Sequence, residues 1–199
     1  DYATKNLWPR LRVRDASTHT GMHETRGWAP GRQLYFAIRF SRPMSARQLL
    51  NREEGVEYRG FAAPGKTPAD KVLVEGKALV AALEFGVPAD GTLLVKVALS
   101  PVSEDSAIAN LDEMPGWDFD AERGRASNAW NEALSSVKAD APEPMRTMFY
   151  TALYHSMLAP SLFMDRDGRY RGPDNQVHQA KGFDFHSTFS LWDTYRALH

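Results

Sequence analysis

The last eighteen residues, Gly182 to His199, have the sequence GFDFHSTFSLWDTYRALH and bring aromatic, hydroxyl and charged side chains together in a short span. In the second half of this stretch the apolar residues Leu191, Tyr195 and Leu198 recur at spacings of four and three, which predicts an amphipathic helix. Asp193 falls in the first turn of that helix, where unpaired backbone N–H groups and the helix dipole favour a carboxylate. Such an acid is available to a polar ligand, and it is equally typical of an ordinary helix start.

Composition limits the classes of function. The chain has 199 residues, 43% of them hydrophobic, and a formal net charge of −1, so there is no broad electrostatic case for nucleic acid or for an anionic membrane surface. A neutral, polar partner fits better. The absence of cysteine excludes a disulfide framework and a thiolate metal site, and it fits either the cytosol or a bacterial periplasm. Because the chain begins at Asp1 and ends at His199 within a helical pattern, we expect a fragment of a longer protein.

The first half of the chain has the pattern of an antiparallel sheet. Residues 33–41 alternate apolar and polar side chains, with Leu34, Phe36 and Ile38 on one face, which predicts a half-buried strand. Residues 47–71 are polar and allow at most one short strand, near 56–61. Short strands without intervening helices indicate one half of a β-sandwich. Further strands are expected over 71–75, 78–85 and 93–99, and residues 1–31, with clusters at 11–14 and 18–25, are expected to form short strands and loops.

The second half is predicted to be mostly helical. Ser103 suits the cap of a helix over 104–114, Asp118 opens a longer helix to about 139, and Pro144 starts a third that ends near 159. Residues 140–144, with two prolines, form the best linker. A small hairpin is expected after the third helix, from turn signals at Asp167–Gly168 and at 172–174.

Most local motifs for chemistry are absent. His19 and His23 lack the order of a zinc-binding helix, so we interpret them as part of a surface loop. Asp165 and Asp167 begin like a calcium-binding loop, but the later ligand positions hold the wrong residues. No G-x-S-x-G elbow or phosphate-binding glycine loop is present. His155 and His178 are expected to be structural, as is His186, although its polar, aromatic surroundings keep it as a ligand candidate.

Aromatic rings beside carboxylates suit a sugar site, because ring faces stack on the C–H face of a pyranose while fixed polar groups bind its hydroxyls. The same mixture also serves an ordinary junction between packed helices. The candidate rings are Trp117, Phe119, Phe183, Phe185, Phe189, Trp192 and Tyr195, and the candidate polar groups are Asp118, Asp184, Asp193 and Arg196.

Longer segments resemble a known family. The strings MFYTALYHSMLAPSLFMDRDGRYRG (148–172) and STFSLWDTYRALH (187–199) are similar to glycoside hydrolase family 92, the calcium-dependent exo-acting α-mannosidases. Upstream, GRQLYFAIRFSRPM (31–44) and KVALSPVSEDSAIANLDEMPGWDFDAERGRASNAWNEAL (96–134) resemble the same family in the same order. The most specific motif is STFSLWDTYR.

The resemblance implies an α+β multidomain fold. Residues 1–102 would be part of an antiparallel β-sandwich domain, residues 103–140 linker helices, and residues 141–199 the start of a truncated (α/α)6 barrel. The family's active site lies between the sandwich and the barrel. This layout agrees with the order of strands and then helices that the residues themselves predict.

The resemblance also implies a function and a site. The parent protein would remove terminal α-linked mannose by inverting hydrolysis that calcium assists, in the periplasm of a bacterium or outside the cell. Asp193 would contact the mannose, with Trp192 and Arg196 as its support and His186 nearby. We expect no catalytic residue and no metal ligand to be assignable here, because the family's acid, base and most calcium ligands lie downstream. Residues 1–199 alone are therefore expected to be inactive.

The expected partners are mannose-containing glycans and the remainder of the catalytic domain, with neither nucleic acid nor a membrane span. Two other functions stay open. One is a non-catalytic carbohydrate-binding or interdomain module, which would keep glycan binding in a polypeptide ending near Asp140. The other is a glycoside phosphorylase of similar layout, which phosphate dependence would distinguish.

Overall fold

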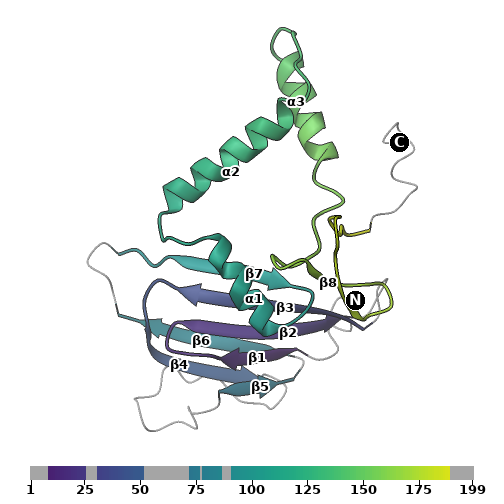
Figure 1. Cartoon of the computed structure of the whole chain (residues 1–199). Helices are drawn as coiled ribbons and strands as arrows, with labels where there is room; N and C mark the ends of the chain where they lie inside the picture. Colours follow the sequence, from purple (N-terminus) through teal and green to yellow (C-terminus); the bar gives the residue numbers. More distant parts are fainter. Residues whose placement is uncertain (1–8, 26–30, 52–71, 77, 87–90, 189–199) are drawn as a thin grey trace. The chain divides into compact units, whose positions relative to one another are not determined.

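The computed structural model describes residues 9–25, 31–51, 72–76, 78–86 and 91–188, and the chain divides into two compact units (Figure 1). The sheet unit consists of residues 1–117 and 164–181, and the helical unit of residues 118–163 and 182–199. The chain therefore changes unit three times. The predicted domain boundaries after residues 102 and 140 concern a larger protein and stay a prediction.

A five-stranded antiparallel sheet with the order β5-β1-β2-β3-β7 forms the main layer of the sheet unit. Its central pair, β2 and β3, is in unbroken register from Thr18 opposite Arg39 to Thr25 opposite Arg32. The strands predicted at 33–41, 71–75 and 93–99 are confirmed as β3, β5 and β7. The strands are β1 (Arg10–Val13), β2 (Thr18–Thr25), β3 (Arg32–Phe40), β5 (Leu73–Glu75) and β7 (Val95–Ser100).

Strand β2 corrects one interpretation. His19 and His23 lie within it, so the predicted surface loop is wrong. The His19 side chain is only 2% exposed, and its ring meets that of Phe40 edge-on with centroids 6.0 Å apart. Pairing with a strand on each side converts a polar, glycine-containing sequence into a central strand.

A second, two-stranded sheet pairs β4 (Met44–Asn51) with β6 (Leu79–Phe85). Strand β4 was not predicted, because MSARQLLN lacks the alternation of a half-buried strand, and it is held by pairing with β6 over most of its length. Phe40 of the first sheet and Phe85 of the second have ring centroids 4.9 Å apart, so the two sheets meet. The possible strand near 56–61 lies outside the described residues.

Helix α1 (Glu104–Asn110) and the short 3-10 helix η3 (Leu111–Glu113) cover one face of the main sheet. Ser103 caps α1 as predicted, since its side chain accepts a 3.0 Å hydrogen bond from the Ser106 N–H. Ala107 of α1 and Leu111 of η3 pack with Ala37 of β3. The half-buried description of β3 is therefore wrong, because the face that carries Ala37 is also covered.

A small hairpin of β8 (Arg169–Arg171) and β9 (Val177–Gln179) completes the sheet unit. Its connection is the second predicted turn, residues 172–176, where Asn175 adopts a φ of 63°. The Asp167–Gly168 turn comes before β8 and is closed by a 2.8 Å hydrogen bond from the Gly168 N–H to the Asp165 carbonyl. A hairpin in this region is confirmed, but its turn is the second predicted turn and not Asp167–Gly168, which was predicted as the hairpin turn.

The helical unit contains α2 (Phe119–Leu134) and α3 (Met145–Ser156). Asp118 caps α2 as predicted, accepting a 2.9 Å hydrogen bond from the Ala121 N–H. Helix α2 ends five residues before the predicted 139, because Ser135 closes the last turn through its backbone N–H and its hydroxyl. Trp130 and Tyr154 join the two helices with ring centroids 4.6 Å apart.

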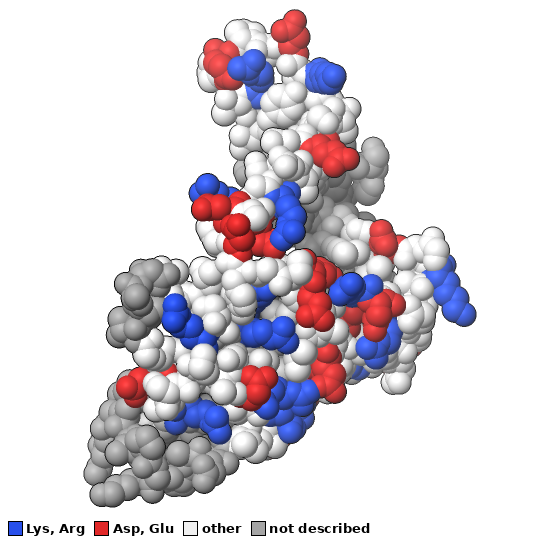
Figure 2. Space-filling view, turned by 60° about the vertical axis from the view of Figure 1, so that its left-hand side comes forward, with Lys and Arg blue, Asp and Glu red and all other residues white. Residues whose placement is uncertain are grey.

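Neither α2 nor α3 has a buried residue. Met148 is 68% exposed, and Phe119 is exposed to a similar degree. Antiparallel sheets with a few helices are thus the architecture of the described residues. Acidic and basic side chains are interspersed on the face shown in Figure 2, which agrees with the small net charge. Within the described ranges, no helix has the length and apolar character needed to cross a membrane.

Candidate functional site

The segment that leads into the STFSLWDTYR motif is paired with the chain that follows α3. The Phe163 N–H donates to the Phe185 carbonyl at 2.8 Å, and the Ser187 N–H donates to the Ser161 carbonyl at 2.7 Å. The Ser187 hydroxyl accepts a further 3.0 Å hydrogen bond from the Ser161 N–H. Leu162 lies opposite His186 in this antiparallel bridge. Residues 161–163 and 185–187 therefore form one small paired element, here called the entry bridge.

His186, a predicted site residue, lies in the middle of the entry bridge with an exposed side chain. Its Nδ1 is 3.2 Å from the Asp184 carbonyl, which makes Nδ1 the protonated nitrogen if it donates there. The other ring nitrogen, Nε2, then remains an acceptor that is available to a hydroxyl donor. His186 is positioned by backbone pairing, and it is accessible to a polar ligand.

The other predicted substrate-binding residues, Trp192, Asp193 and Arg196, lie outside the described residues, as do Phe189 and Tyr195. Among the described rings, Phe183 and Phe185 belong to the segment before the motif, and the Phe185 ring lies 6.5 Å from that of Phe163. Phe183 is about half exposed.

Two predicted aromatic candidates have other environments. Trp117 belongs to the sheet unit, where the Lys96 ammonium lies 4.5 Å from its ring centroid. Phe119 is exposed at the start of α2. Asp118, a candidate polar group, uses its carboxylate to cap α2. Trp117 and Asp118 were candidates for a sugar site because of their residue types. In the structure Trp117 contacts Lys96 and Asp118 caps α2, so both have local structural roles.

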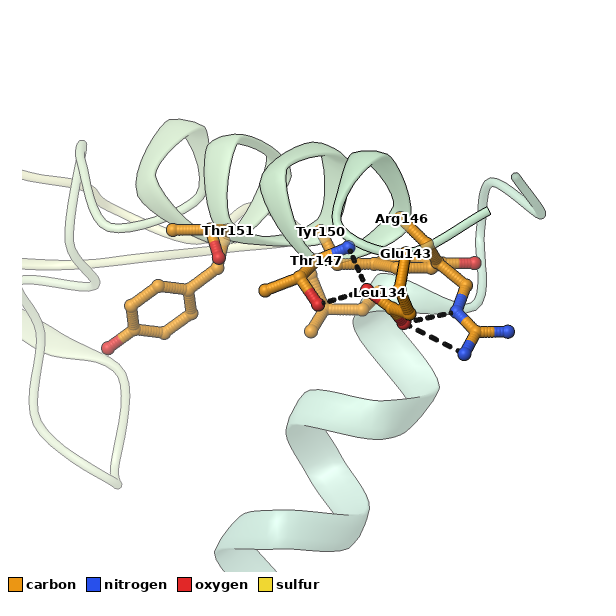
Figure 3. A pocket seen from close by; sticks show the side chains of 7 residues that line it. Leu134, Glu143, Arg146, Thr147, Tyr150 and Thr151 are labelled. Atoms are coloured by element: carbon orange, nitrogen blue, oxygen red, sulfur yellow. Dashed lines mark hydrogen bonds and ion pairs between the residues drawn. The ribbon is translucent and has the colours of Figure 1, made fainter. Parts of the chain in front are cut away.

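A groove of about 410 Å³ runs beside α3 (Figure 3). Its acid, Glu143, accepts hydrogen bonds from the Thr147 hydroxyl at 2.6 Å and from Arg146 Nε at 2.9 Å. The Thr147 hydrogen bond and the Arg146 guanidinium lower the pKa of Glu143. A general acid needs a raised pKa near neutral pH, so Glu143 does not suit that role. The groove is lined by Leu134, Glu143, Arg146, Thr147, Tyr150, Thr151 and Tyr154.

The sheet unit contains a buried acid that sequence reasoning considered only as a calcium ligand. Asp165 is 2% exposed, and its carboxylate accepts hydrogen bonds from the Ser100 hydroxyl at 2.7 Å and from Asn110 Nδ2 at 2.8 Å. Burial raises the pKa of Asp165, and the two hydrogen bonds partly offset that effect. No local signal could have identified this cluster, because its members come from β7, α1 and the segment before β8.

The described part of the chain contains no group of side chains that could hold a metal ion. Across those residues, no three histidine or acidic side chains come close enough together to hold an ion. Asp165 already has protein donors on both carboxylate oxygens, which does not fit a calcium ligand. The expected calcium therefore has no fitting site among the described residues.

Comparison with known proteins finds similarity to one family of glycosidases. Residues 106–199 match the family model for the glycosyl hydrolase family 92 catalytic domain. An α-mannosidase of this family from Bacteroides thetaiotaomicron has 34% sequence identity and a TM-score of 0.82, over 96% of this chain and 25% of that chain. Its complex with mannoimidazole matches with the same TM-score and identity.

Two further relatives extend the comparison. An inverting mannosidase of family 92 from the same bacterium has 25% identity and a TM-score of 0.73, over 97% of this chain and 26% of that chain. An uncharacterized secreted glycosidase of Arthroderma benhamiae is 33% identical in an alignment of 122 positions that covers 57% of this chain and 15% of the relative. The chain thus spans about a quarter of these solved structures and less of the curated relative.

Proposed function

We propose that this polypeptide belongs to an enzyme that removes terminal α-linked mannose from glycans. The chain is similar to glycoside hydrolase family 92 over nearly its whole length. The observation that carries the proposal is the match of 96% of the chain to a family 92 α-mannosidase that is also known in complex with mannoimidazole. The family model agrees, since it covers both α2 and α3 as well as the motif.

The proposed reaction is a single displacement with inversion. A carboxylic acid protonates the leaving oxygen while a carboxylate base activates a water molecule on the opposite face of the sugar. The relative named an inverting mannosidase supports this stereochemistry. Neither role is assigned to a described residue: Glu143 has a lowered pKa, and Asp165 is buried with both oxygens occupied.

We propose that Asp193 binds the mannose through its carboxylate, with Trp192 and Arg196 as support. The support for this assignment is the WDT sequence within STFSLWDTYR. The exposed His186 lies six residues before Trp192 and offers a ring nitrogen to a sugar hydroxyl. Each of these side chains would bind and orient the sugar ring, and the proton transfers would fall to residues outside this chain.

The rest of the proposal concerns the whole protein. The exposed apolar side chains of α2 and α3 suit helices that pack against further helices of an (α/α)6 barrel, with the main sheets as part of a β-sandwich domain. Calcium is proposed as a cofactor from the family resemblance, held by residues elsewhere. A periplasmic or secreted location is supported by the secreted relative. Residues 1–199 alone are proposed to be inactive.

The test is an assay of the full-length protein on α-linked mannobioses, with and without a calcium chelator, alongside Asp193→Ala. We expect mannose release by the parent, loss of release with the chelator, and a loss of at least about 100-fold in kcat/KM for Asp193→Ala, since substrate-positioning contacts contribute on this scale. An active parent whose Asp193→Ala variant keeps full turnover would show that the Asp193 assignment is wrong.

Two controls accompany this assay. Asp184→Ala removes a candidate acid from the same stretch, and it separates a specific role of Asp193 from a general effect of charge. Phosphate is varied as well, because turnover that requires phosphate would indicate a phosphorylase. Mannose release by purified residues 1–199 would contradict the proposed inactivity of the segment.

A further inference from the structure

The two faces of the main sheet carry different side chains. On the face covered by α1, the Thr20 hydroxyl donates to Glu104. Because successive residues of a strand point to opposite faces, His19 points away from α1. Val13 of β1 and Ile38 of β3 lie directly opposite His19 and share its face. His19 is therefore a basic group among apolar side chains.

The second sheet packs on this same face and brings another basic group to it. Its Phe85 ring lies 4.9 Å from that of Phe40, which in turn meets the His19 ring at 6.0 Å between centroids. Leu83 is two residues from Phe85, and Arg47 of β4 lies directly opposite Leu83. Arg47 thus shares the face of Leu83 and Phe85 that is turned towards the main sheet.

Both basic groups lack hydrogen-bond partners in this space. His19 is 2% exposed, and among the described residues neither of its ring nitrogens nor Arg47 Nε has a partner. A protonated His19 ring would need acceptors for two N–H groups and would face a second positive charge. Burial and the charge of Arg47 both lower the pKa of His19, whereas Asp15 raises it.

The other charged groups near this face are further away or exposed. Asp15 and Arg42 lie in exposed turns, where solvent weakens their effect on His19. His23 and Arg32 share the face of His19, but they are four and six residues along their strands, about 13 Å and 20 Å from the His19–Ile38 pair. The described parts of β1, β5, β6 and β7 place no titratable side chain on it.

The second sheet is the layer that is easier to displace. Among the described strands β4 pairs only with β6, and a two-stranded sheet is marginally stable by itself. The main sheet has five strands and is covered by α1 on its other face. A positive charge that arises between the two sheets is therefore solvated most readily when β4 and β6 move away from the main sheet.

We propose that His19 is a pH-sensitive switch between the two sheets: protonation of its ring places a second positive charge opposite Arg47, and β4 and β6 then open away from the main sheet. With a neutral His19 ring the two sheets stay packed. All of these residues belong to the sheet unit, and the switch does not rest on the proposed function.

The experiment measures amide hydrogen exchange in the full-length protein at pH 7.5 and pH 5.0, with each rate divided by its intrinsic rate to give a protection factor. We expect the protection of β4 and β6 to fall about tenfold at pH 5.0, because a histidine that is neutral when packed protonates once it is exposed. At both pH values β4 and β6 should be less protected than β2 and β3.

Three variants assign this fall to its cause. His19→Leu keeps an apolar side chain of similar size and cannot titrate, so the protection of β4 and β6 should be the same at both pH values. Arg47→Met removes the opposing charge and should show a smaller fall than the parent. His23→Leu is the matched control, since His23 lies on the same strand and face but is exposed, and it should show the full fall.

Three results would overturn the switch. One is a parent whose β4 and β6 amides keep their protection at pH 5.0. Another is a fall in His19→Leu as large as that in the parent. The third is equal protection of both sheets, which would show that the sheet unit opens as a whole. If His19→Leu fails to fold, as judged by circular dichroism, the decision passes to Arg47→Met, and a fall equal to that of the parent overturns the proposal.

Discussion

The Asp165 carboxylate accepts a 2.7 Å hydrogen bond from the Ser100 hydroxyl, which joins two buried residues that are 65 positions apart in the chain. The acid belongs to the segment before β8 and the hydroxyl to the end of β7. Because burial raises the pKa of Asp165, this contact has a consequence for stability at different pH values.

The first prediction concerns that pH dependence. A carboxyl whose pKa is raised by folding adds stability below its unfolded pKa of about 3.9, and this contribution is lost as the pH rises through the folded value. Asp165→Asn cannot ionise, so its free energy of unfolding should approach or exceed that of the parent as the pH rises. Urea unfolding of both proteins from pH 4 to 8 measures this difference. A difference that is constant with pH would contradict the prediction.

His19 gives a prediction of the opposite sign. Burial lowers the pKa of His19, Arg47 lowers it further, and neither ring nitrogen has a hydrogen-bond partner among the described residues. The neutral ring is therefore favoured in the folded state, and stability is lost as the pH falls from about 6.5 towards the folded pKa. His19→Leu should remove that part of the loss, as measured by urea unfolding at pH 7.5 and 5.0. Equal losses in the parent and in His19→Leu would show that other groups control this range.

Glu104, a buried acid at the start of α1, holds the helix to β1 and β2. Its carboxylate meets Arg10 at 2.6 Å and Arg12 at 3.2 Å, and it accepts from the Thr20 hydroxyl at 2.7 Å. Glu104→Gln should cost about 1–3 kcal/mol in the free energy of unfolding, because the buried Thr20 hydroxyl and two partly exposed arginines lose a charged acceptor.

The control for Glu104 is Asp120→Asn. Asp120 pairs with Arg123 on the exposed surface of α2, so its loss should cost no more than about 0.5 kcal/mol. Denaturant unfolding of both variants compares the two acids. Similar small effects would show that the Glu104 network contributes no more than a surface pair.

Two glycines should respond oppositely to alanine. A Cβ on Gly21 would lie 2.4 Å from the Arg10 carbonyl oxygen and equally close to the Phe36 ring, so Gly21→Ala should destabilise by about 1–3 kcal/mol. Gly124 lies in the exposed interior of α2, where its would-be Cβ meets no described atom within 4 Å apart from its chain neighbours and its own helix backbone. Gly124→Ala should therefore stabilise by about 0.5–1 kcal/mol. Thermal unfolding measures both, and the same sign for both would contradict the prediction.

Local patterns predicted the elements whose stability is also local. Alternation identified β3, and capping residues identified the starts of α1 and α2. Strand β4 was missed because it depends on its pairing with β6, and the burial of His19 was missed because it depends on the strands on either side. No pattern within a short stretch of sequence indicates either interaction.

The candidate site was predictable to a smaller extent. Residue types pointed to a sugar site near the motif, and the structure places His186 in the entry bridge, accessible to a ligand. The assignments of Asp193, Trp192 and Arg196 stay predictions. The Asp165 cluster was invisible to sequence reasoning, because hydrogen bonds spanning 55 and 65 positions are created only by the fold.

The return of residues 164–181 to the sheet unit means that this unit is not one continuous length of polypeptide. A polypeptide that ends at residue 117 would contain β1–β7 and α1. It would lack Asp165, which accepts hydrogen bonds from the Ser100 hydroxyl and the Asn110 amide, and Arg169, which donates to the Ser106 hydroxyl. A recombinant version of the sheet unit therefore has to run through codon 181 and carry α2 and α3 with it. Exchange of segments with a related protein after residue 181 keeps the acid and its two donors from a single parent, whereas exchange after residue 117 separates them.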